Sequence, residues 1–339
     1  MYLFEKIGLG NLSTYRSQIM GIAAIMIVLC HAPYYGVEMP SMLRAVIGSG
    51  GLGVDIFLFV SGFGCYYSLK CHKDSSWGSW YKKRFVRIFI PYALMQIPIW
   101  AYYIVTADFD VTRNLCIFST VTFWTEHVGA WYVALLLPLY LITPPLYVLL
   151  QKSGNQRFKV SIILIVALIT VCYLDSGGVD GVLHEIQKNL QWAFKRSASF
   201  ILGMAIAPYI QENRKVNPVL VILIAVILFF GVHRMISRDI FMDWCKVPVL
   251  LIFILLILNW ANKYKKPYSF ITWMGTASLE SYLANIYLCG VMRNLASGLG
   301  DLPILNGKYL EYSGVILFGL FLTYFVNCLS SRLKNALKI

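Results

Sequence analysis

Ten apolar runs in this sequence are long enough, or nearly so, to cross about 30 Å of hydrocarbon as helices. A further segment, 111–125, is predicted to lie at the membrane interface. No linker or long polar block separates the runs, so they predict a single transmembrane domain over residues 1–339. The expected fold class is an all-α integral membrane protein with about ten transmembrane helices, at 17–36, 45–69, 86–107, 129–150, 158–175, 197–212, 216–233, 246–262, 270–292 and 312–331.

The overall composition excludes a soluble protein. Hydrophobic residues make up 58% of the chain and charged residues only 13%, whereas soluble domains carry about 25% charged residues. The same values exclude a disordered or collagen-like chain. The first apolar run follows a polar stretch and lacks a small-residue cleavage site, so we interpret it as a retained helix rather than a signal peptide.

The excess of cations lies on one side of the predicted membrane. With a cytoplasmic N-terminus, the cytoplasmic segments carry 19 Lys and Arg with three acidic residues, whereas the outer segments carry 10 cations with 11 acidic residues. Lys and Arg mark the cytoplasmic face of membrane proteins, so we predict that both termini are cytoplasmic. The net charge of +13 is therefore an orientation signal, and it gives no reason to expect nucleic-acid binding.

Three ionisable residues are predicted to lie within the membrane, where such side chains are costly and usually line an interior cavity. His31 and Asp55 fall in the outer halves of the first two runs, and Glu280 falls near the middle of the ninth. We expect that His31 and Asp55 can meet, and a histidine oriented by a carboxylate is a natural general base at neutral pH. The alternative is a buried histidine and a carboxylate that serve packing alone.

Two arginines at the cytoplasmic start of the third run share a helix face. Arg84 and Arg87 are spaced i,i+3, so two guanidinium groups can hold a diphosphate or a phosphorylated cofactor there. The alternative is ordinary anchoring at the cytoplasmic face, which also explains Lys82 and Lys83.

Other reactive residue types give weaker signals. Ser61 offers a nucleophile, but no base is spaced locally to activate it, and packing is the alternative. The eight cysteines are scattered, without a Cys-x-x-Cys pair, so we expect no disulfide framework and no metal site.

Taken together, these segments resemble the multi-pass membrane acyltransferases of acyltransferase family 3, the O-acetylase type. The resemblance covers most of the chain. It does not extend to the extracytoplasmic esterase-like domain that some larger relatives carry, and we expect no such appended domain here. The segments that carry it are Gly21–His31, Gly53–Gly62, Arg84–Pro91, Trp131-Tyr132 with Tyr140–Pro144, and, more weakly, Gly275–Asn285.

The resemblance implies an enzyme that transfers groups other than amino-acyl groups, in a bacterial cytoplasmic membrane. Such enzymes move an acyl group, commonly acetyl, from cytoplasmic acyl-CoA to a hydroxyl of a cell-envelope carbohydrate or lipid-linked glycan. By matching position, His31 is the expected catalytic histidine, with Asp55 in the second motif. Arg84 and Arg87 correspond to the arginine pair implicated at the acetyl-CoA site.

The sequence departs from the family pattern at two positions. The arginine that usually precedes the histidine corresponds to Met20, and we expect Arg16, one turn nearer the cytoplasm, to substitute for it at the donor phosphates. The late histidine of the family is Asn285 here, so its role does not transfer.

The expected mechanism is direct transfer, with His31 as the base and the acyl-CoA phosphates near Arg84, Arg87 and Arg16. Oxyanion stabilisation is assigned to polar neighbours, and an acyl-enzyme on Ser61 is the alternative route. The rival class is a multi-pass transporter of a lipid-linked sugar or small solute, with His31, Asp55 and Glu280 as a proton relay. No repeat relates the two halves as in many transporters, and an envelope scaffold would not explain the intramembrane carboxylates. The possible supporting residues are Ser61, Trp131, Glu280, Tyr282 and Asn285.

Overall fold

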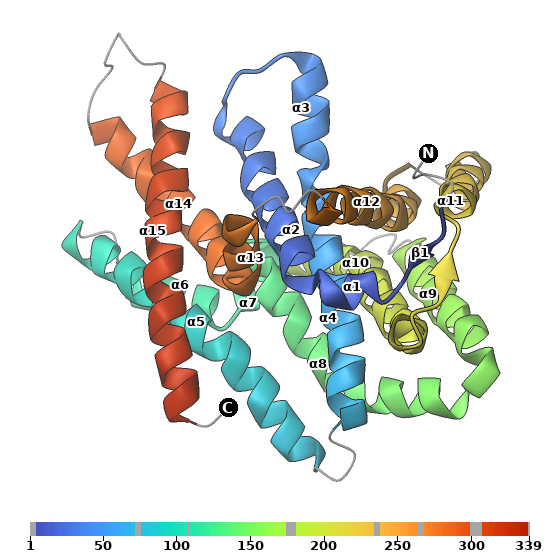
Figure 1. Ribbon diagram of the computed structural model, residues 1–339. Helices are drawn as coiled ribbons and strands as arrows, with labels where there is room; N and C mark the ends of the chain where they lie inside the picture. Colours follow the sequence, from blue (N-terminus) through green and yellow to red (C-terminus); the bar gives the residue numbers. More distant parts are fainter. Residues whose placement is uncertain are drawn as a thin grey trace.

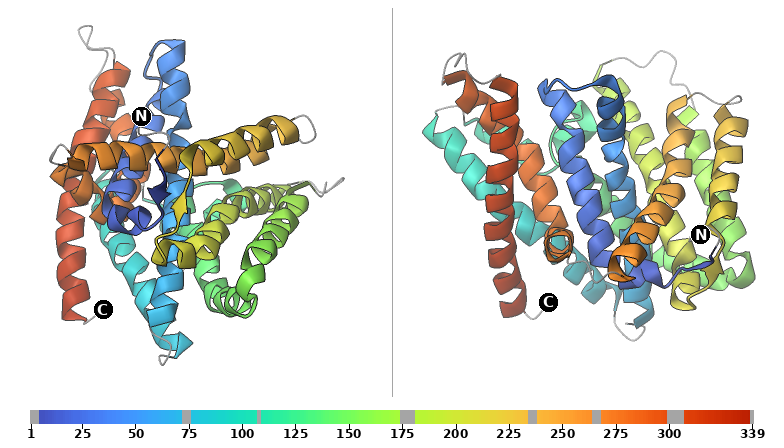
Figure 2. Two further views of the ribbon diagram at one scale, coloured as in Figure 1. Left: turned by 45° about the vertical axis from the view of Figure 1, so that its right-hand side comes forward. Right: turned by 45° about the horizontal axis from the view of Figure 1, so that its top comes forward.

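The computed structural model is 88% helical and describes residues 5–71, 76–106, 109–173, 181–233, 238–263, 268–298 and 307–337. Two short antiparallel strands, β1 (Ile7–Gly8) and β2 (Lys215–Val216), join the N-terminal segment to the chain between two helices. The helices α2 and α4 lie in the middle of the bundle, with α15 on one side and α9 and α11 on the other (Figures 1 and 2).

The helical elements follow one another with short connections. The α-helices are α1 (Asn11–Thr14), α2 (Arg16–Cys30), α3 (Ser41–Gly48), α4 (Leu52–Cys71), α5 (Trp77–Val105), α6 (Val111–Phe118), α7 (Val121–Glu126), α8 (Trp131–Lys152), α9 (Arg157–Tyr173), α10 (Val182–Gln211), α11 (Pro218–His233), α12 (Arg238–Lys263), α13 (Ser269–Thr276), α14 (Ser278–Gly298) and α15 (Gly307–Ala336). Three 3₁₀ turns are η2 (Ala32–Tyr35), η3 (Ser49–Gly51) and η4 (Gly154–Gln156).

Each predicted apolar run coincides with helical structure, which confirms an all-α membrane protein. Within the described residues, five helical segments are long and apolar enough to cross a membrane, and two shorter apolar helices accompany them. The five are Ser41–Cys71, Trp77–Val105, Trp131–Lys152, Lys246–Lys263 and Glu311–Ala336. The count of ten crossings and the cytoplasmic location of both termini stay predictions.

The ninth predicted run differs from expectation because it forms two helices rather than one. The helix α13 ends at Thr276, and α14 begins at Ser278 after a break at Ala277. On the N-terminal side of the break, α13 crosses α2 with almost no space between the backbones. A Cβ atom on Gly275 would stand 1.7 Å from the Ser17 carbonyl oxygen, and one on Gly21 would stand 1.9 Å from that of Ile271. This crossing fixes α13 against α2.

Glycines also bring α4 against its two main neighbours. A Cβ on Gly62 would stand 2.1 Å from the carbonyl oxygen of Phe200 in α10, and one on Gly203 the same distance from that of Phe59. On the side facing α2, a Cβ on Gly53 would stand 2.5 Å from the Ala23 carbonyl oxygen. The glycine-rich start of the second run therefore serves close helix packing, which places the polar residues of α4 between α2 and α10.

Candidate active site

A cavity of about 550 Å³ is lined by five of the ten candidate site residues that the sequence singles out. It is lined by α2, α4, α5, α8, the junction of α13 and α14, and α15. Among the described residues that line it, four side chains are cationic and Glu280 is the only carboxylic acid. The four are Arg16, Arg84, Arg87 and Lys334. We refer to this space as the cationic cavity.

Gly64 of α4 is the point where two of these arginines meet. The Arg84 guanidinium donates a long hydrogen bond to the Gly64 carbonyl oxygen at 3.5 Å. A Cβ on Gly64 would stand 2.6 Å from a terminal nitrogen of Arg16, so the glycine leaves room for that side chain. Arg16 also lies 5.6 Å from the centre of the Phe63 ring, and Arg84 lies 5.4 Å from that of Trp80, both within cation–π range.

The charges in the cavity do not balance. Arg16 interacts electrostatically with both Arg84 and Arg87, and these contacts are repulsive. Within the described part of the chain, none of the three arginines makes an ion pair within 4.0 Å. A planar guanidinium group can donate two parallel hydrogen bonds to two oxygens of one phosphate. The cavity therefore has the chemistry of a site for a multiply charged anion.

The start of α14 forms another wall of the cationic cavity. Because the ninth run is broken at Ala277, the first turn of α14 lines the cavity with Ser278 and Glu280. Free N–H groups and the helix dipole make such an N-terminus favourable for anions. Glu280 is buried and accepts a 3.4 Å hydrogen bond from Asn327 of α15, so it also joins α14 to α15.

Two hydroxyl groups of the cavity lie close to each other. The Ser61 and Tyr132 hydroxyl groups are 3.4 Å apart, and both residues line the cavity. The Tyr282 hydroxyl accepts a 3.1 Å hydrogen bond from the backbone N–H of Tyr132. The rings of Tyr132 and Tyr282 pack edge to face with centres 5.5 Å apart. Of the predicted supporting residues, Ser61 and Glu280 therefore line the cavity, and Tyr282 packs against the lining residue Tyr132.

Asp55 is paired with an arginine that the sequence reasoning did not single out. Its carboxylate forms an ion pair with Arg196 of α10 and accepts a 3.3 Å hydrogen bond from Ser199. The Arg196 guanidinium also lies over the rings of Trp131 and Trp192, 5.9 and 5.2 Å from their centres. A carboxylate buried in a membrane requires a partner such as a cation. That requirement could have pointed to Arg196, which lies at the polar start of the sixth predicted run.

His31 caps the C-terminal end of α2, with its ring fixed by the backbone. Its Nδ1 lies 2.7 Å from the Ile27 carbonyl oxygen, and 3.7 Å from the Cys30 sulfur. A carbonyl oxygen can only accept, so Nδ1 carries the proton of the neutral ring and Nε2 presents a lone pair. Arg196 interacts electrostatically with the neighbouring Cys30. The arginine thus pairs with Asp55 and also acts on the part of α2 that carries His31.

His31 and the cationic cavity occupy opposite ends of α2. Arg16 and His31 are 15 residues apart on this helix and its cap, which is about 22 Å at 1.5 Å per residue. His31 does not line the cationic cavity. Asn285 is buried and lines a different, smaller cavity of about 200 Å³ between α2, α13, α14 and α15. Met20, at the position of the missing family arginine, does line the cationic cavity.

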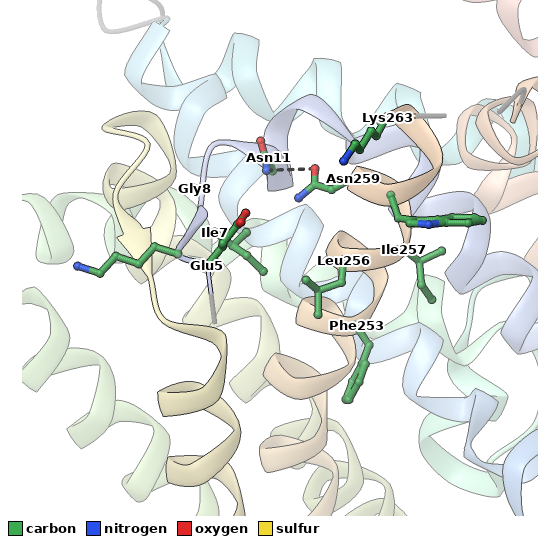
Figure 3. A pocket seen from close by; sticks show the side chains of 11 residues that line it. Glu5, Ile7, Gly8, Asn11, Phe253, Leu256, Ile257, Asn259 and Lys263 are labelled. Carbon is green, nitrogen blue, oxygen red and sulfur yellow. Dashed lines mark hydrogen bonds between the residues drawn. The ribbon is translucent and has the colours of Figure 1, made fainter. Parts of the chain in front are cut away.

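A second large cavity has a different chemistry. It measures about 580 Å³ and lies between the N-terminal segment and the C-terminal half of α12 (Figure 3). Asn11 donates a 3.4 Å hydrogen bond to Asn259 at one end, and the α12 wall is formed by Phe253, Leu256 and Ile257 (Figure 3). None of the predicted site residues is among the described residues that line it. The cationic cavity is therefore the candidate active site.

The fold and this site define a helical membrane protein with an interior cationic cavity. Residues 19–332, nearly the whole chain, match the profile of a protein family described as an acyltransferase domain. The chain belongs to this family, acyltransferase family 3, as the sequence motifs indicated. Searches of curated proteins and of solved structures found no match.

Proposed function

We propose that this protein is a membrane O-acyltransferase that moves an acyl group, acetyl in the simplest case, from cytoplasmic acyl-CoA to a hydroxyl of a cell-envelope carbohydrate or lipid-linked glycan. Family membership supports acyl transfer in general. The observation that carries the choice of donor is the cationic cavity, in which Arg16 and Arg84 meet at Gly64 and Arg87 lines the same space. The setting we propose is a bacterial cytoplasmic membrane.

The residues of the cavity fit the charged part of acyl-CoA. The diphosphate needs paired donors, which Arg84 and Arg87 supply from one face of α5, and Arg16 faces the same space from α2. The acyl end of the donor must then extend toward the opposite end of α2, about 22 Å from Arg16, to meet His31. The long, uncharged pantetheine arm of the donor suits this route.

His31 acts as the general base in this mechanism. Nδ1–H is held by the Ile27 carbonyl, so Nε2 is the nitrogen that takes the proton from the acceptor hydroxyl. The hydroxyl oxygen attacks the thioester carbonyl, the carbon–sulfur bond breaks, and the thiolate leaves and takes up the proton. Asp55 is paired with Arg196 and so holds this cation near the end of α2 that carries His31. Tyr132, the hydroxyl neighbour of Ser61, is a weak base, so we favour direct transfer over an acyl-enzyme.

Transfer of labelled acetyl from acetyl-CoA to extracted envelope glycan tests this function. Purified protein should catalyse the transfer, and His31→Ala should lower its rate by about 10²–10⁴-fold while leaving acetyl-CoA binding intact. Transfer that persists in His31→Ala contradicts the assigned base. A protein that never consumes acetyl-CoA contradicts the enzyme and favours the transporter.

A further inference from the structure

The last helix contributes its own polar stripe to the cationic cavity. Asn327, Ser331 and Lys334 are spaced i, i+4 and i+7, so they share one face of α15, and all three line the cavity. Arg332, two residues from Lys334, lies on another face and is exposed. Lys334 therefore lines the cavity together with Asn327 and Ser331, whereas Arg332 does not.

Lys334 lies near charged groups of both signs. It interacts electrostatically with Glu280 and with Arg87, but within the described residues no carboxylate lies within 4.0 Å of its ammonium group. Glu280 instead accepts its hydrogen bond from Asn327. A partly buried lysine beside an arginine adds to the repulsion in the cavity, which an anionic ligand would relieve.

We propose that Lys334, with the Ser331 hydroxyl beside it, binds the 3′-phosphate of coenzyme A and makes the protein select coenzyme A over 3′-dephospho-coenzyme A. This inference rests on the proposed donor. Coenzyme A carries two separate anionic groups, a diphosphate and a ribose phosphate. The cavity offers cations from different helices: Arg16 on α2 with Arg84 and Arg87 on α5, and Lys334 on α15. A compact ammonium suits a single phosphate, whereas paired guanidinium groups suit the diphosphate.

Binding of two ligands by the full-length protein in detergent tests the assignment. Wild type should bind coenzyme A more tightly than 3′-dephospho-coenzyme A. Lys334→Met should weaken coenzyme A binding about tenfold or more, which is the effect of losing one charge-assisted hydrogen bond. The same variant should bind 3′-dephospho-coenzyme A as wild type does, which also shows that it is folded. Arg332→Met, the matched control, should leave both affinities unchanged.

Three outcomes contradict the proposal in different ways. If Lys334→Met weakens the binding of both ligands equally, Lys334 does not recognise the 3′-phosphate. If it weakens the binding of neither ligand while wild type binds coenzyme A, the assignment of Lys334 is wrong and the proposed donor is still supported. If wild type binds neither ligand, the proposed function falls together with the assignment.

Discussion

Asp55 and Arg196 hold opposite charges in the interior of the bundle. Asp55 is 2% exposed, and the Arg196 side chain is covered by the rings of Trp131 and Trp192. Each charge is tolerable there because the other is present, since an isolated buried ion carries a large desolvation cost. The pair joins α4 to α10 beside the end of α2 that carries His31.

Replacing Arg196 by Leu should therefore destabilise the protein by about 3–5 kcal/mol, because Asp55 would be left buried without its cation. The double variant Asp55→Leu with Arg196→Leu should recover much of that loss, since no unpaired charge remains. Thermal unfolding in detergent measures both. A single variant that is no less stable than the double variant would contradict the pairing.

The arginine pair on α5 gives a test that separates ligand binding from membrane anchoring. Arg84→Ala with Arg87→Ala should weaken acetyl-CoA binding by about 100-fold or more, because two charge-assisted contacts are lost. Lys82→Ala with Lys83→Ala is the matched control, since these exposed lysines precede the pair on α5 and do not line the cavity. Equal effects of the two double variants in a binding titration would identify the arginines as anchors only.

Glycines allow helix α2 to pack closely against its neighbours in the middle of the bundle. Gly21 meets α13, and Ala23 and Met26 present their carbonyl groups to Gly53 and Gly50 of the segment that leads into α4. Small residues let backbones approach closely, which in a membrane is a main source of helix association. The same contacts carry Arg16 into the cavity, so packing and the site depend on one another.

Gly21→Ala should be destabilising by about 1–3 kcal/mol or more, because the added methyl would stand 1.9 Å from the backbone oxygen of Ile271. Gly48→Ala, the control, adds a methyl group with nothing within 4 Å and should be close to neutral. Thermal unfolding of the two purified variants provides the comparison. Similar melting temperatures would contradict the tight crossing of α2 and α13.

The predicted arrangement of the chain across the membrane rests on the distribution of its cations. The prediction of ten crossings with both termini in the cytoplasm places the α8–α9 connection inside and the α6–α7 region outside. The proposed chemistry depends on this prediction, because it requires the cationic cavity to open toward the compartment that supplies acyl-CoA.

Labelling of single cysteines in a cysteine-free background tests the predicted orientation. Asn155→Cys, between α8 and α9, should react with a membrane-impermeant maleimide only after the cells are permeabilised. Ser119→Cys, between α6 and α7, should react in intact cells, because α8 lies between the two positions. Labelling of both positions from the same side would rule out a crossing by α8.

The fold was predictable where the signal is local. Apolar runs of about twenty residues and the i,i+3 spacing of Arg84 and Arg87 are properties of the sequence, and the helices and the cavity lining agree with them. The break at Ala277 was not, because no proline interrupts the ninth run there, and the close packing of Gly275 on α2 beside the break is a tertiary contact.

The remaining site residues escaped prediction for a related reason. Arg196 follows Lys195, and Lys334 lies two residues after Arg332. In the sequence, Arg196 and Lys334 are therefore ordinary cations at the ends of apolar runs. Only the packing of α10 on α4 brings Arg196 to Asp55, and only the position of α15 brings Lys334 to the cavity. A carboxylate at the position of Asp55 needs a partner in the membrane, but the sequence does not show which of the available cations meets it.

The cationic cavity joins α2 to α15, and this constrains how the protein is made. Arg16 leaves the ribosome long before Lys334, yet both line the same space. A nascent chain in the membrane therefore lacks one wall of the cavity until α15 has been inserted. We expect binding of the proposed donor only from that point, not progressively as the earlier helices are made.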